Sequence, residues 1–116
     1  MDKNLREFFV LVVYVPVDAC EQVKRAIFAQ GAGKIGNYDS CSWQVTGSGQ
    51  FRPLAGSSPV LGRHEVLERT QEVRLEVTCE KEQLAAVLEA LLDEHPFEEP
   101  AYHFYSVQAL ARSAVN

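Results

Sequence analysis

Four side chains that can bind a metal ion lie within nine residues of one another near the end of the chain. They are His95, Glu98, Glu99 and His103. Imidazole nitrogens and carboxylate oxygens are common ligands of divalent metals, so a divalent metal site is one hypothesis for this segment. Pro96 and Pro100 rule out the single helical face that an HExxH site needs. The alternative is a rigid turn from helix to strand, with His95 as a cation favoured by the helix dipole.

The glycine-rich segment GAGKIG, residues 31–36, imitates the phosphate-binding pattern GxGxxG. It follows an expected helix instead of a strand, so no helix N-terminus faces a phosphate there. Glycines with positive φ that turn the chain from helix into strand are one interpretation. Backbone amides that form an anion-binding concavity beside Lys34 are the other.

Two cysteines and two arginines have alternative roles. If their strands pair as a hairpin, Cys41 and Cys79 can face each other and suit a soft metal such as Cu(I), whereas buried free cysteines act as small hydrophobic residues. Arg52 and Arg74 are expected to form ion pairs. The three cysteines include no CxxC pair, which is typical of a reducing compartment.

Composition limits the class of protein. The 116 residues are 47% apolar and 23% charged, which predicts one globular domain over residues 1–116. A net charge of −5 without a basic cluster argues against a nucleic-acid partner. The longest apolar run, residues 8–15, is shorter than the roughly 20 residues that span a bilayer, and no secretory signal is recognisable, so we expect a cytoplasmic protein without a membrane partner.

Hydrophobic periodicity predicts six elements. Residues 8–15 read as a strand, followed by a helix that begins with a capping box at Asp18 and Glu21 and ends at Gly31. Alternation predicts strands over 41–45 and 73–78, separated by a long loop over 47–70. A second helix is predicted from the apolar spacing of residues 84–91 and ends before Pro96, and residues 101–107 form the last strand.

The order β-α-β-β-α-β is that of the ferredoxin-like split βαβ, an α+β fold. It places two helices on one face of a four-stranded antiparallel sheet. The first strand has no polar face, and leaving one of its large apolar side chains in water forgoes roughly 1.5–3 kcal/mol. We therefore expect another subunit to cover the second face of the sheet.

Five motifs together resemble the CutA-like, PII-like domain of the YqfO proteins, also called NGG-one-interacting-factor-three-like. The resemblance covers about residues 8–107. Trp43 and Phe97 stand where that family usually has Phe and Tyr, and Val60-Leu61-Gly62 follows a looser pattern. The motifs are GAGKIGNY at 31–38, CSW at 41–43, GSGQFRP at 47–53, EVRLE at 72–76 and HPFEEPAY at 95–102.

The resemblance implies a homo-oligomer, with a trimer expected first, because CutA and PII relatives pack their sheets together as trimers. In full-length YqfO proteins this domain is inserted between two halves that hold a two-metal site. Neither half is found among these 116 residues, so no residue here can be assigned those ligands or a metal-dependent hydrolase activity. The family implies a ligand-sensing or scaffold role.

Two functions follow as hypotheses. The first is a non-enzymatic oligomeric module that binds a small ligand, a metal ion or a partner protein in clefts between subunits. The second is a metal-assisted hydrolase that uses His95 and its neighbouring carboxylates. We expect a ligand site where the 31–38 turn, the loop around Arg52 and the 95–102 turn meet, on the premise that both helices end at one end of the sheet. The expected ligand-binding residues are Lys34, Asn37, Tyr38, Arg52, His95 and Glu98.

Overall fold

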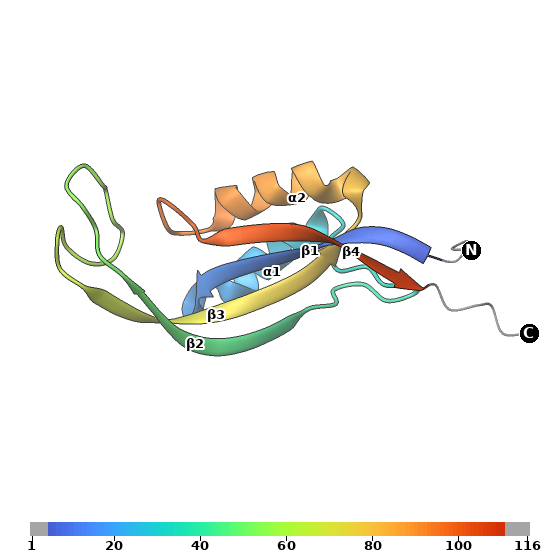
Figure 1. Cartoon of the computed structure of the whole chain (residues 1–116), viewed down its shortest axis with the longest axis horizontal. Helices are drawn as coiled ribbons and strands as arrows, with labels where there is room; N and C mark the ends of the chain where they lie inside the picture. The colour runs from blue at the N-terminus through green and yellow to red at the C-terminus, as the bar shows by residue number, and fades with distance from the viewer. Residues whose placement is uncertain (1–4, 111–116) are drawn as a thin grey trace, which may run out of the picture.

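A computed structural model of the chain describes residues 5–110 as four strands and two helices around one sheet. The elements are β1 (Leu5–Pro16), the 3-10 turn η1 (Val17–Ala19), α1 (Cys20–Ala29), β2 (Trp43–Phe51), β3 (Glu68–Cys79), α2 (Lys81–Glu94) and β4 (Tyr102–Leu110). The strand order is β2-β3-β1-β4, and every neighbouring pair is antiparallel. Both helices cover the same face of the sheet (Figure 1). The predicted ferredoxin-like α+β fold is confirmed.

The core lies between the sheet and the two helices. Leu11, Val13 and Val15 alternate along β1 toward the helices and have no exposed surface. Each such side chain contributes about 1.5–3 kcal/mol by its burial. The other large core residues are Val23 and Ile27 of α1, Val73, Leu75 and Val77 of β3, and Val87 and Leu91 of α2.

No helix within residues 5–110 is long and apolar enough to cross a membrane.

The helix ends follow the sequence signals except at the start of α1. Gly31 has a φ of 102°, and its N–H donates to the carbonyl of Phe28, so the predicted glycine C-terminus is confirmed. The prediction of a capping box at the start of this helix is wrong. Asp18 lies in η1, and the N-cap residue Ala19 has no side-chain cap. The tight 3-10 turn replaces the cap, because the N–H of Cys20 donates to the carbonyl of Val17.

The β2–β3 hairpin is longer than predicted, and the loop between its strands spans only residues 52–67. We call this segment the hairpin loop; it projects beyond the helices in Figure 1. The prediction treated Gly47 and Gly49 as loop residues, but both lie in the edge strand β2. At Gly49 the carboxylate of Glu72 occupies the place of a side chain, since a Cβ there would lie 2.5 Å from Oε1 of Glu72 and would have to displace it. This glycine is therefore a packing feature of the sheet.

The sheet face away from the helices, here called the open face, combines apolar and charged side chains. Val12 lies at its centre with 0% exposure, between Glu76 of β3 and His103 of β4 in the strand register. By the same alternation Val10 and Tyr14 lie on this face and are half-buried. The larger exposed apolar side chains of the open face are Trp43, Val45 and Tyr105. Coverage of this face by another subunit remains a prediction.

Candidate functional site

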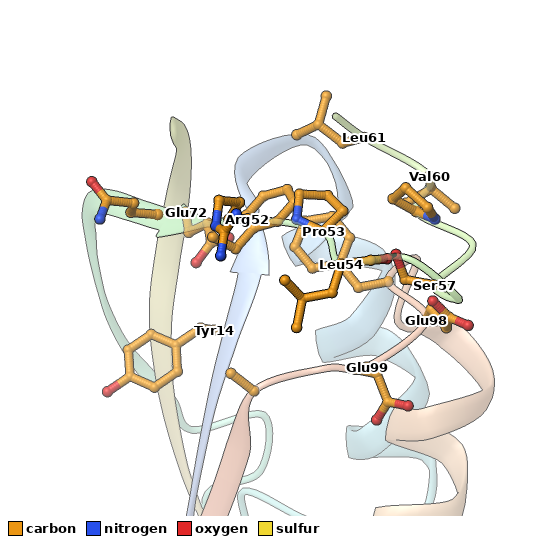
Figure 2. A pocket seen from close by; sticks show the side chains of 15 residues that line it. Tyr14, Arg52, Pro53, Leu54, Ser57, Val60, Leu61, Glu72, Glu98 and Glu99 are labelled. Atoms are coloured by element: carbon orange, nitrogen blue, oxygen red, sulfur yellow. Dashed lines mark hydrogen bonds between the residues drawn. The ribbon is translucent and has the colours of Figure 1, made fainter. Parts of the chain in front are cut away.

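A cavity of about 410 Å³ lies where the hairpin loop meets the turn between α2 and β4 (Figure 2). We call residues 95–101 the α2–β4 turn. Four separate parts of the chain form the lining, namely β1, the end of β2 with the hairpin loop, β3 and this turn. The charged and hydroxyl-bearing lining residues are Tyr14, Arg52, Ser57, Glu72, Glu98 and Glu99. The apolar lining residues are Phe51, Pro53, Leu54, Pro59, Val60, Leu61, Phe97 and Ala101.

The backbone of Tyr14 holds both ends of the α2–β4 turn. Its carbonyl oxygen lies 2.7 Å from Nε2 of His95, and its N–H donates to the carbonyl of Ala101 at 3.0 Å. The N–H of Phe97 donates to Nδ1 of His95 at 3.1 Å. Since Nδ1 accepts, Nε2 carries the proton and donates to Tyr14. These bonds fix the turn that carries Phe97, Glu98 and Glu99.

His95 is a structural histidine in this arrangement. Its side chain is 6% exposed, and this burial lowers its pKa, an effect that the hydrogen bond to Tyr14 offsets only in part. The rigid turn that we expected is present. The prediction that His95 is a cation is wrong, because burial favours the neutral ring. Both ring nitrogens already have backbone partners, so neither is free to bind a metal within this chain.

The hairpin loop and the end of β2 are held against the α2–β4 turn by a polar and an aromatic contact. The N–H of Ser58 donates to Oε1 of Glu98 at 2.9 Å. The rings of Phe51 and Phe97 lie 6.0 Å apart between centroids. Arg52 and Glu98, two of the expected ligand-binding residues, therefore line the same cavity.

Glu72 brings a poorly solvated carboxylate to the cavity wall. Its side chain lies over Gly49, and burial raises its pKa. Among residues 5–110 no basic side chain lies within 4.0 Å of it. The nearby Arg74 instead pairs with Glu76 at 3.0 Å, as its position in the sequence predicted. An uncompensated carboxylate therefore borders the cavity.

Lys34, Asn37 and Tyr38 lie at the other end of the sheet. The prediction that the 31–38 turn meets the other two segments is therefore wrong within one chain. They line a separate depression after α1. The N–H of Gly33 donates to the carbonyl of Thr78, whose register partner is Val10, whereas the α2–β4 turn is held at Tyr14. Four strand residues separate these anchors by about 13 Å. The physical reason is that α1 follows β1 and α2 follows its antiparallel neighbour β3, so the helices end at opposite ends.

The glycine segment acts as a turn in the structure. The amides of Gly33 and Ile35 donate to the carbonyls of Thr78 and Tyr38, so these two N–H groups are not available to an anion. Gly36 has a φ of 57° within the tight turn between Ile35 and Tyr38. The chain-turning interpretation accounts for these residues.

The expected metal ligands do not gather in one chain. His103 lies on the open face, with its ring 6.3 Å from that of Tyr105, while Glu98 is held by Ser58 at the cavity. Within residues 5–110, no three His, Cys, Asp or Glu side chains are close enough to share a metal ion. His95 and Glu98 are held by the turn and the hairpin loop, whereas His103 lies on the open face of β4, and this keeps the nominated groups apart.

The two cysteines also do not pair. Cys41 precedes β2 and does not pair with β3. Its N–H donates to the carbonyl of Gly33, whose own N–H donates to Thr78 of β3, so the Gly33 segment lies between Cys41 and the strand that ends at Cys79. Cys79 is buried in the core, which raises its pKa to about 11, and it behaves as a small hydrophobic residue.

Sequence reasoning missed several residues of the cavity. Tyr14, Glu72 and Phe97 all lie in recognised strands or motifs but were not nominated as site residues. One signal was present for Glu72. Its register partner on β2 is Gly47 and its diagonal neighbour on the same face is Gly49, so neither position offers a side chain to pair with the carboxylate.

Comparisons with known proteins agree with this fold. No family model matches the chain. It is 47% identical over 96 residues to a Mycobacterium leprae protein and 44% identical over 98 residues to a Bacillus subtilis protein, both named GTP cyclohydrolase 1 type 2 homolog. These alignments cover 83% and 84% of this chain but only 25% and 26% of the relatives. The chain thus spans about a quarter of the length of the curated relatives it matches.

Two solved structures illustrate the structural similarity. A Bacillus cereus protein related to NIF3 superposes with a TM-score of 0.76 at 36% identity, over 92% of this chain and 27% of that one. CutA from Synechococcus elongatus gives a TM-score of 0.65 at 17% identity, over 93% of this chain and 87% of CutA. The second likeness concerns the fold alone.

The order of the elements and of the strands is that of a CutA-like, PII-like fold. The chain belongs to the YqfO, or NIF3-related, family and corresponds to about a quarter of its longer members, so the resemblance drawn from the five motifs is confirmed. These relationships support a small binding or regulatory module.

Proposed function

We propose that this domain is a non-enzymatic binding module that forms a homo-oligomer, with a trimer expected first, and holds a small ligand in the cavity between the hairpin loop and the α2–β4 turn. The observation that carries the proposal is the cavity itself. Its volume of about 410 Å³ lies in the range of small-molecule sites, which are mostly apolar with a few placed polar groups. The lining here has that composition.

The cavity is held by contacts between segments that are distant in the sequence. The hydrogen bond from Ser58 to Glu98 joins the hairpin loop to the turn, the contact of Phe51 with Phe97 joins the end of β2 to it, and Tyr14 fixes the turn to the sheet. A ligand that contacts both walls would stabilise the loop against the turn. Ligand binding would thus be linked to the position of the hairpin, which suits a regulatory module.

The oligomer is supported by the open face. Tyr105, Trp43 and Val45 expose large apolar side chains there, beside the half-buried Val10. Apolar surface gains free energy when it leaves water, and a second subunit on the open face would remove it from water. The hairpin loop would then lie within reach of a neighbouring subunit or a partner protein.

A hydrolase that uses His95 has less support. Its ring nitrogens are both bonded to backbone groups, and Glu98 already accepts a backbone N–H. A catalytic base must reach the proton that it abstracts, and His95 is enclosed under the turn. The cyclohydrolase name belongs to relatives about a quarter of whose length this chain spans, so we do not extend that activity to this domain.

Native mass spectrometry of freshly isolated protein tests the proposal, because it reports the oligomer and a retained ligand together. Ala101→Trp fills the cavity while its backbone carbonyl still accepts from Tyr14. Ala85→Trp places the same side chain on the exposed side of α2 and serves as the control. We expect retained small-molecule mass in the wild type and the control, and its loss in Ala101→Trp. Retention of the same mass in Ala101→Trp would contradict the proposed site.

A further inference from the structure

The charged residues of the cavity lining are mostly acidic. Three carboxylates, those of Glu72, Glu98 and Glu99, line the cavity with a single guanidinium, that of Arg52. Arg52 lies 4.0 Å from Glu65, which is outside the lining, and the lining itself carries two more carboxylates than guanidinium groups. Glu98 accepts a hydrogen bond from the backbone of Ser58. Glu72 and Glu99 have no basic partner within residues 5–110, and the cavity therefore favours positive charge.

Aromatic rings in the lining favour the same sign of charge. Tyr14, Phe51 and Phe97 all border the cavity, and the faces of aromatic rings attract cations. The ring of Tyr14 already lies 5.9 Å from the guanidinium carbon of Arg74. That guanidinium is paired with Glu76 and is not part of the lining. Phe51 and Phe97 have no such cation beside them in the described chain.

The remaining lining is apolar, which limits the kind of cation. Pro53, Leu54, Val60 and Leu61 form the hairpin-loop wall. A hydrated metal ion gains nothing from such a wall, whereas an organic body does, at about 25 cal/mol for each Å² that leaves water. The volume suits a molecule with a ring or short chain beside its charged group.

We infer that the cavity binds a small organic cation, an ammonium group on an apolar body, with Glu72 and Glu99 as counter-charges and the Phe51 and Phe97 rings beside it. This inference rests on the proposed function, because it assumes that the cavity takes a small ligand. It adds the chemical class of that ligand and the residues that select it.

Three aromatic probes of similar size separate the effect of charge from the effect of shape. Benzylammonium, benzyl alcohol and benzoate share one ring and differ in charge, and each is titrated into the intact isotope-labelled protein while amide NMR shifts are followed. We expect benzylammonium to shift the amides of Phe97 and Ala101 and to bind at least about fivefold more tightly than benzyl alcohol, with benzoate weakest.

Charge-removing variants locate the effect. Glu72→Gln and Glu99→Gln keep the side-chain shape and should each reduce the preference for benzylammonium about threefold or more. Glu89→Gln removes one charge from the exposed side of α2 and should leave the preference unchanged. The two cavity variants are independent, so a folding defect in one leaves the other as the test, and amide shifts away from the cavity report the fold.

The outcomes distinguish this inference from the proposal on which it rests. Tighter binding of benzoate than of benzylammonium, or equal binding of all three probes, overturns the cationic class but leaves a small-molecule cavity. A benzylammonium preference that neither Glu72→Gln nor Glu99→Gln changes also overturns the inference. If none of the probes shifts the cavity amides at millimolar concentration, the inference is wrong, whereas the small-ligand function is decided separately by the native masses of the wild type and Ala101→Trp.

Discussion

Nε2 of His95 donates a hydrogen bond of 2.7 Å to the carbonyl oxygen of Tyr14, and this bond joins the turn after α2 to a central strand of the sheet. The N–H of the same residue, Tyr14, donates to Ala101 at the far end of the turn. One strand residue therefore sets the position of Phe97, Glu98 and Glu99 at the cavity. The role of His95 is to position these residues, and its chemistry is that of a neutral hydrogen-bonding ring.

Replacing His95 should destabilise the fold. His95→Ala leaves the Tyr14 carbonyl and the Phe97 N–H without their partner in a buried site and opens a void under the turn. We expect a loss of about 2–4 kcal/mol in the free energy of unfolding, measured by urea denaturation. His103→Ala, on the exposed part of β4, is the control and should cost much less. Equal losses in the two variants would contradict the positioning role of His95.

The stability of the wild type should depend on pH through His95. Burial holds its pKa in the folded protein below the ordinary value of about 6.5, so the unfolded chain binds the proton more readily. The contribution of His95 is then complete above about pH 6.5 and declines as the pH falls below that value toward the folded pKa. His95→Gln should lack this decline.

Urea denaturation between pH 7.5 and pH 5 measures the difference between these two proteins. Burial raises the pKa of Glu72 and contributes a pH dependence of the opposite sign, but Glu72 is present in both proteins and its effect cancels. The advantage of the wild type over His95→Gln should shrink on acidification. An advantage that stays constant or grows would contradict a depressed pKa for His95.

The fold was predictable because its signals are local and repeated. The continuous apolar run of β1, the alternation along β3 and the apolar spacing of α2 predicted the order of elements, and Gly31 and Pro96 ended the helices as their backbone chemistry requires. The extent of β2 was not predictable from its own residues. Gly49 is typical of a loop until the carboxylate of Glu72, 23 positions later, is seen to lie over it.

The candidate site was predictable only in part, for a topological reason. The meeting of Arg52 with Glu98 follows from a long loop folding back, and the structure shows it. Lys34 and Asn37 were placed at the wrong end, because α1 and α2 follow strands of opposite direction and cannot end at the same edge. The cavity wall formed by Tyr14 depends on tertiary packing that no local pattern indicates.

Gly49 and Gly47 form a matched pair that tests the placement of Glu72. A Cβ at position 49 would meet the Glu72 carboxylate at 2.5 Å, whereas a Cβ at position 47 meets nothing within 4 Å. Gly49→Ala should push the carboxylate toward solvent and lower the pKa of Glu72 toward its ordinary range, as measured by carbon NMR titration of the side chain. Gly47→Ala should leave that pKa unchanged and stabilise the protein by about 0.4–1 kcal/mol through the unfolded chain. Identical titration of Glu72 in both variants would show that its burial has another origin.

The last prediction concerns the open face of the sheet. Tyr105 of β4 and Leu92 of α2 are both 45% exposed in one chain, but Tyr105 lies on the open face and Leu92 on the helical side. If subunits pack through the open face, Tyr105→Glu would bury an unpaired carboxylate at the contact, which costs several kcal/mol in each interface. Light scattering should then give about three times the 13.0 kDa mass of one chain for the wild type and for Leu92→Glu, and a lower mass for Tyr105→Glu. A wild-type monomer at micromolar concentration would refute the oligomer. A wild-type dimer would keep the burial argument, since the apolar side chains of the open face would still leave water, but it would remove the trimer inferred from the CutA resemblance.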